Sequence, residues 1–159
     1  MTDPILEISG EVARPANLTV DDLAAIDAAA QIADVSTIDP ARRGRAVTLE
    51  GLLAAVGALP SAVYLTLHAS ADDFHASVPL AAVRERGILI YQVDGAPLPV
   101  AAGGPVRFYI SDHAACHSDE VDECANVKFV DRIELTRHRG VDNRPQDDES
   151  HEELHRREG

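Results

Sequence analysis

The chain has 159 residues and a formal net charge of −13, so it is long enough to close one core and too acidic to attract DNA, RNA or anionic lipid surfaces. Hydrophobic residues make up 45% of the chain but aromatic residues only 4%, so Ala, Val, Leu and Ile have to build the core. The first ten residues lack the basic and apolar regions of a secretory signal, and no apolar run approaches the ~18–20 residues that cross a bilayer. We therefore expect a cytoplasmic protein without nucleic-acid or membrane partners, in which thiols stay reduced.

Hydrophobic periodicity and turn residues divide the chain into short strands and helices. Thr19 and Thr48 are good helix N-caps, and Gly57 and Gly87 are good helix ends. The dipeptide Asp94–Gly95 is typical of a tight β-hairpin turn. In chain order we expect a strand at 5–12, a helix at 20–26, a strand at 29–38, a loop at 39–46, a helix at 47–58 and a strand at 62–70. Segment 72–87 should form a turn, a short extended piece and a short helix, followed by a strand at 88–93, a Gly/Pro-rich turn at 94–105, and strands at 106–112 and 127–138.

The order of these elements predicts the fold class. Six or seven short strands and three helices without strict βαβ alternation indicate a mixed α+β domain instead of a doubly wound sheet. The chain has no Gly-rich phosphate loop and no G-x-S-x-G nucleophile elbow. Only Val141 and Leu154 are apolar beyond residue 138, apart from glycine and proline. We expect one domain over residues 1–138 and a disordered or weakly helical charged tail over residues 139–159.

Five segments follow one another in this order: LTVDDLAAI, VTLEGLLAAVG, DDFHASVPL, VDGAPLPVAAGGPVRFYI and NVKFVDRIEL. With these segments the chain, from about Ile8 to Leu135, resembles the molybdopterin-binding domain of the sulfite oxidase family. The resemblance implies an α+β fold of mixed layered β-structure with short helices. It also implies a molybdopterin cofactor, whose dithiolate holds molybdenum, and an oxidoreductase that acts on a small-molecule substrate. The sequence does not indicate an oligomeric state.

The resemblance also implies which residues bind the cofactor. Arg107 of the GGPVR segment would face the pterin phosphate, Lys128 stands where the family has a cofactor-binding Lys, and Asn126 stands where it often has Ser. Both charges suit that role, because a guanidinium pairs bidentately with phosphate and an ammonium acts as a point charge. No catalytic residue is identified. His68 and His75 are candidate proton donors, although a single His at a strand end more often bonds a backbone carbonyl.

One departure from the family concerns the metal ligand. In the family a ligand cysteine precedes the helix that reads VTLEGLL here, but segment 35–46 contains no Cys, and Ser36 or Asp39 offers only oxygen ligands. The alternative function is therefore a non-catalytic binding module of the same fold, with a structural metal as an option at the loop that holds Cys116 and Cys124. The same segment holds a basic cluster that either binds the pterin phosphate or, as we favour for an isolated charge run, is solvated: Arg42, Arg43 and Arg45.

Both cysteines lie in an acidic segment ahead of the last expected strand. Cys116 and Cys124 have His113 and His117 as neighbours, and two Cys with two His form a common zinc ligand set. The spacing is not that of a standard zinc finger. Three readings stay open for this segment: a site for zinc or another metal, a disulfide or redox pair, and two unrelated structural thiols.

Overall fold

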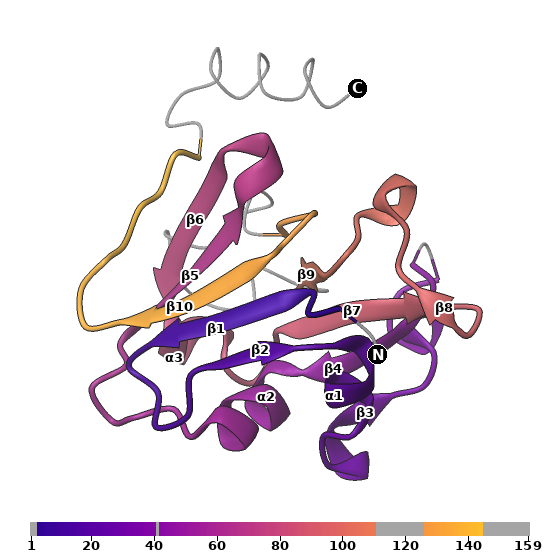
Figure 1. The fold of residues 1–159 in the computed structure, drawn as a ribbon, viewed down its shortest axis with the longest axis horizontal. Helices are drawn as coiled ribbons and strands as arrows, with labels where there is room; N and C mark the ends of the chain where they lie inside the picture. Colours follow the sequence, from indigo (N-terminus) through magenta and orange to yellow (C-terminus); the bar gives the residue numbers. More distant parts are fainter. Residues whose placement is uncertain (1–2, 41, 111–125, 145–159) are drawn as a thin grey trace.

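The computed structural model describes residues 3–40, 42–110 and 126–144, which fold into two β-sheets with short helices beside them (Figure 1). The strands are β1 Leu6–Gly10, β2 Ala16–Leu18, β3 Gln31–Ile32, β4 Arg45–Thr48, β5 Tyr64–Ala69, β6 Phe74–Pro79, β7 Ile88–Val93, β8 Ala96–Pro97, β9 Arg107–Tyr109 and β10 Arg132–Thr136. The α-helices are α1 Val20–Ala24, α2 Leu49–Val56 and α3 Leu80–Val83, and the 3₁₀ turns are η1 Ala28–Ala30, η2 Val35–Thr37, η3 Ser70–Asp72 and η4 Val100–Ala102. The predicted α+β class is confirmed.

The two sheets differ in how their strands connect. The first sheet has the order β2-β1-β10-β5-β6, and within it β1 and β10 run parallel while the other neighbours run antiparallel. The second sheet has the order β3-β4-β7-β8, with β9 also paired to β7. Strand β9 pairs with the first half of β7, and β8 pairs with the last two residues of β7. The Gly/Pro-rich segment between β8 and β9 therefore starts and ends beside the same strand.

Strand alternation gives the second sheet two buried faces. One face joins the first sheet in the main core, which includes Leu65, Ile133, Leu89 and Phe108. The other face carries a smaller buried cluster that contains Ile88, Ile90 and Tyr109. Since side chains two residues apart in a strand point to the same face, Arg107 lies on the face that carries Tyr109 and not in the main core.

The helix starts predicted from the sequence are confirmed. Thr19 and Asp22 form a reciprocal capping box at α1. The side chain of Thr48 accepts a hydrogen bond from the N–H of Gly51 at the start of α2. That helix ends at Gly57, whose φ of +68° is the left-handed conformation that glycine adopts without strain.

The strand expected at residues 29–38 is wrong over most of its length. Only the two residues of β3 pair as a strand, between the 3₁₀ turns η1 and η2. The carboxylate of Asp27 accepts a hydrogen bond from the N–H of Ala29, and that of Asp34 accepts one from the N–H of Ser36. These local bonds offer the backbone an alternative to a strand, which is why apolar spacing alone misassigned the segment.

The last two expected strands are present in shortened form, and the chain stays packed beyond the second of them. Phe129 has a φ of +61° and interrupts the segment before β10. After β10 the chain runs back along β6, where residues 139–144 form hydrogen bonds (Figure 1). The predicted charged tail therefore stays a prediction for residues 145–159, which lie outside the described residues. No helix in the described part of the chain is long and apolar enough to cross a membrane.

Candidate functional site

The side chains of Arg107 and Lys128 come together over one glycine. Arg107 is the first residue of β9, and Lys128 lies in the loop before β10. This loop is tied to Gly103 because the N–H of Phe129 donates to the Gly103 carbonyl at 2.8 Å. A Cβ atom placed on Gly103 would lie 3.2 Å from Cδ of Arg107 and 3.5 Å from Cγ of Lys128. A guanidinium and an ammonium from two distant segments thus share one side of the molecule.

Arg42 adds a third cation to this group. Its guanidinium carbon lies 5.2 Å from the centre of the Tyr109 ring, in the range of a cation–π contact. Burial lowers the pKa of Arg107, and the nearby charge of Arg42 lowers the pKa further. A guanidinium starts from so high a pKa that Arg107 stays charged at neutral pH all the same.

Both arginines present hydrogen-bond donors that lack acceptors. The Nε atoms of Arg42 and Arg107 are buried and have no hydrogen-bond partner among the described residues. Nor does either guanidinium form a salt bridge within that part of the chain. Buried hydrogen-bond donors normally have an acceptor, and two nearby positive charges repel each other unless a negative charge lies between them. This arrangement is what an anion would complete.

Asn126 fixes the loop that carries Lys128. Its side-chain oxygen accepts a hydrogen bond of 2.8 Å from the N–H of Ile110, just after β9. This bond occupies the oxygen and leaves the amide nitrogen as the group that can contact a ligand. Asn126 therefore has a structural role that sequence reasoning did not anticipate.

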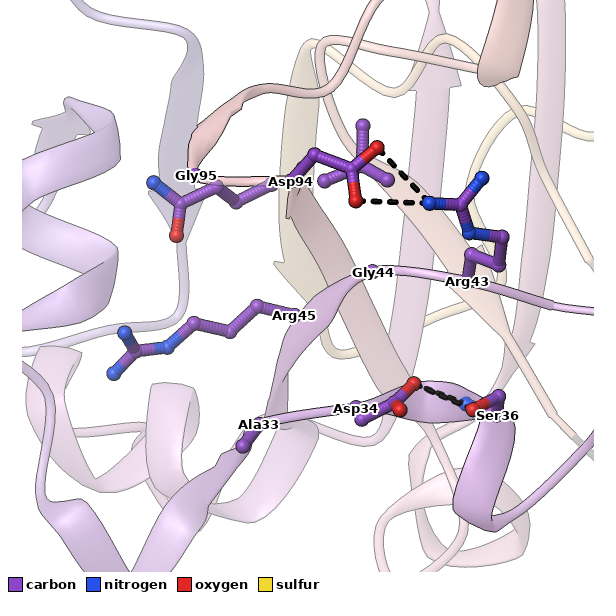
Figure 2. Close-up of a pocket in the computed structure, with 10 residues that line it drawn as sticks. Ala33, Asp34, Ser36, Arg43, Gly44, Arg45, Asp94 and Gly95 are labelled. Atoms are coloured by element: carbon purple, nitrogen blue, oxygen red, sulfur yellow. Dashed lines mark hydrogen bonds and ion pairs between the residues drawn. The ribbon is translucent and has the colours of Figure 1, made fainter.

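A hollow lies beside the other two arginines of the basic cluster. It has a volume of about 470 Å³ and lies between the segments 33–36, 43–45 and 92–95. Figure 2 shows that Arg43 points at Asp94, and one nitrogen of its guanidinium lies 2.8 and 2.9 Å from the two carboxylate oxygens, while Arg45 points elsewhere. Arg45 Nε donates to the Gln31 side chain at 3.3 Å. The basic cluster is thus divided: Arg43 is 70% exposed, as expected for a solvated charge, whereas Arg42 lies over the ring of Tyr109.

The two candidate proton donors lie side by side in the first sheet. Nδ1 of His68 on β5 is 2.8 Å from Nδ1 of His75 on β6. Their other ring nitrogens face carboxylates, Glu134 and Asp73 respectively, each at 3.1 Å. Partners thus surround both rings, and these partners are side chains, where the sequence favoured a backbone carbonyl.

The predicted metal ligands lie outside the described residues: His113, Cys116, His117 and Cys124. Within residues 3–40, 42–110 and 126–144, no group of three or more His, Cys, Asp and Glu side chains is arranged to bind a metal. The zinc site stays a prediction.

The sequence model of the oxidoreductase molybdopterin binding domain matches residues 44–143, which is more than half of the chain. The chain belongs to this family. The molybdopterin-binding domain also resembles a solved structure, the sulfane dehydrogenase SoxCD from Paracoccus pantotrophus, with a TM-score of 0.57 and 20% sequence identity. That match covers 84% of this chain and 38% of the SoxCD chain, and at this identity it shows the fold alone. No curated protein matches the sequence.

The described residues fit the anionic part of molybdopterin. The two buried Nε donors without acceptors and the neighbouring Lys128 suit a phosphate, which offers several strong acceptor oxygens. The described residues contribute no thiolate, since both cysteines lie in segment 111–125.

Proposed function

We propose that this domain binds molybdopterin with Arg107, Arg42 and Lys128 around the cofactor's phosphate and with Asn126 at the edge of the site. The observation that carries this proposal is the pair of buried Nε atoms without acceptors, on two guanidinium groups close enough that the charge of Arg42 lowers the pKa of Arg107. A phosphate would satisfy both donors and remove the repulsion between the two cations.

The proposed activity is that of a molybdenum-dependent oxidoreductase domain acting on a small substrate. The bound cofactor would supply a metal centre that exchanges electrons with the substrate. The chain's own contribution is to fix the cofactor in place: β9 holds Arg107, and the loop anchored by Asn126 holds Lys128. Hydrogen bonds tie the backbone at both residues, because β9 pairs with β7 and the N–H of Phe129 donates to the carbonyl of Gly103.

A second candidate is a binding module that keeps the anion site without oxidoreductase chemistry. The segment before α2, where the family has its ligand cysteine, is cysteine-free from η1 to the end of β4. A domain of this kind would bind the pterin phosphate but would not hold molybdenum through its own thiolate.

Cofactor content tests the first proposal and separates it from the second. The full chain is produced in a host that makes molybdopterin, and the purified protein is assayed for molybdenum and for pterin. We expect both in the wild type. Pterin without molybdenum would favour the binding module, and absence of both at saturating supply would contradict cofactor binding.

Two matched variants test whether Arg107 binds the pterin phosphate: Arg107→Met removes the proposed contact, and Arg43→Met is the control. Loss of a charge-assisted hydrogen bond costs about 1.5–3 kcal/mol, so Arg107→Met should weaken pterin binding roughly 10–100-fold. Arg43→Met removes an equal charge that is 70% exposed and paired with Asp94, so pterin content should not change. Equal losses in both variants would mean that general charge, and not this site, attracts the cofactor.

A further inference from the structure

Tyr109 and Asp39 hold Arg42 from two directions. The hydroxyl of Tyr109 donates a hydrogen bond to the carboxylate of Asp39. The N–H of Arg42 donates to the backbone carbonyl of Asp39 at 2.9 Å, which fixes where the Arg42 backbone lies. The Arg42 guanidinium then lies over the ring of the same tyrosine, 5.2 Å from its centre.

Tyr109 is itself rigidly placed. It is only 5% exposed and packs in the cluster on the outer face of the second sheet. Its strand partner on β7 is Ile88. Burial, and next the hydrogen bond to Asp39, raise the pKa of Tyr109, so the phenol is neutral at physiological pH and presents an uncharged ring face to Arg42.

This support matters because Arg42 and Arg107 repel each other. An arginine on a surface loop would turn its charge away from a second guanidinium and into water unless another contact opposed that motion. A cation–π contact to a buried ring provides such an opposing attraction. A side chain already ordered in its binding position also loses less conformational entropy when a ligand arrives.

We propose that Tyr109 and Asp39 are positioning residues that hold Arg42 beside Arg107, so that the two guanidinium groups are in place before a phosphoryl anion binds. This inference rests on the proposed function, because it assumes that the cluster of Arg42, Arg107 and Lys128 binds a phosphoryl group. Neither positioning residue has to touch the ligand.

The test uses the full chain and inorganic phosphate as the probe, followed through the Nε–H signals of the arginines by ¹H–¹⁵N NMR. In the wild type, phosphate should shift the signals of Arg42 and Arg107 and leave that of Arg43 unchanged. Tyr109→Leu removes the ring and should weaken phosphate binding about tenfold, while Tyr109→Phe keeps the ring and should lose about two- to threefold. In an Arg42→Met background, Tyr109→Leu should cause no further loss.

A second measurement needs no substitution and applies even if Tyr109→Leu fails to fold. In the phosphate-free wild type, the ¹⁵N relaxation of Arg42 Nε should match that of ordered backbone, whereas Arg43 Nε should be mobile. Equal mobility of the two side chains would overturn the positioning role. So would a tenfold loss from Tyr109→Leu that persists in the Arg42→Met background, since Tyr109 would then act elsewhere. Absence of any phosphate response in the wild type would instead contradict the anion site of the proposed function.

Discussion

Gly103 is the residue on which the geometry of the anion site depends most directly. It has a φ of +101°, and the side chains of Arg107 and Lys128 both pass beside it. We predict that Gly103→Ala destabilises the fold by about 1–3 kcal/mol through backbone strain. We also predict that it weakens phosphate binding several-fold, because the new methyl group would lie 3.2 Å from Cδ of Arg107 and displace it. Denaturant unfolding and the phosphate titration measure the two effects.

Gly95→Ala is the control for that substitution. Gly95 also has a positive φ, +77°, but a Cβ atom there would meet nothing within 4 Å. It should therefore show the backbone strain without the loss of affinity. If Gly103→Ala bound phosphate as well as Gly95→Ala does, the crowding around Arg107 would have no part in the site.

At the residue scale, the sequence identified part of the candidate site. The resemblance pointed to Arg107 and Lys128, and the structure brings these two together, although their role stays a prediction. The sequence could not show which of the neighbouring residues Arg42 and Arg43 belongs to the site. The two differ only in the folded chain, where the Tyr109 ring on β9 lies under the guanidinium of Arg42. The one sequence signal for Tyr109 is its position two residues after Arg107, which puts both on one face of a strand.

At the scale of elements, the hairpin turn was predicted from the sequence more accurately than the extent of the short strands. The turn predicted at Asp94–Gly95 is confirmed: both residues have positive φ, and β7 and β8 pair directly across them at Val93 and Ala96. Short-range turn chemistry determines such a feature completely. The extent of β9 depends instead on the strand that lies beside it, β7, and the local sequence of β9 carries little information about that pairing.

Two neighbouring strands of the first sheet carry a pair of histidines, and these should make the stability of the sheet depend on pH. His68 and His75 lie opposite each other on β5 and β6, with their Nδ1 atoms 2.8 Å apart. Only one hydrogen fits between these atoms, so at most one of the two rings can be doubly protonated while the contact lasts. The charged groups around the pair are Glu134 and Arg132 on β10 and Asp73 before β6.

We predict that the domain loses stability as pH falls through about 6.5, the ordinary pKa of histidine. Burial lowers the pKa of His68, and the charge of Arg132 lowers it too, against the opposing hydrogen bond that His68 makes to the Glu134 carboxylate. The unfolded chain therefore takes up a proton more readily than the folded chain, so His68 contributes stability above this pH and less below it. Urea unfolding between pH 8 and 5.5 should show this slope in the wild type and a shallower one in His68→Gln.

His138→Gln serves as the control for the pH experiment, since His138 is exposed. Its unfolding free energy should follow the wild-type slope with pH. Parallel curves for wild type and His68→Gln would mean that the buried pair does not contribute to the pH dependence.

For the molecule as a whole, the main question is where the domain ends. Composition predicts an end at residue 138, because polar residues dominate from there on. Yet Arg144 is only 6% exposed, and its guanidinium lies 2.6 Å from the carboxylate of Asp142. Asp142 also accepts from the N–H of Ser77, and Asn143 bonds the backbone of His75, so the segment closes the β6 edge of the first sheet. Charged and polar residues can thus pack against the edge of a sheet, and a domain boundary predicted from hydrophobicity alone misses such a segment.

We therefore predict that Arg144→Ala destabilises the domain by about 3–5 kcal/mol, because it leaves the Asp142 carboxylate buried without its main partner. Arg139→Ala is the matched control: Arg139 also contacts Asp142, at 3.2 Å, but is 47% exposed, so its loss should cost at most about 1 kcal/mol. Chemical denaturation of both variants in the full chain measures the difference. Equal small losses would place the energetic end of the domain at residue 138, whereas the expected difference would make residues 139–144 an integral part of the sheet that supports His68 and His75.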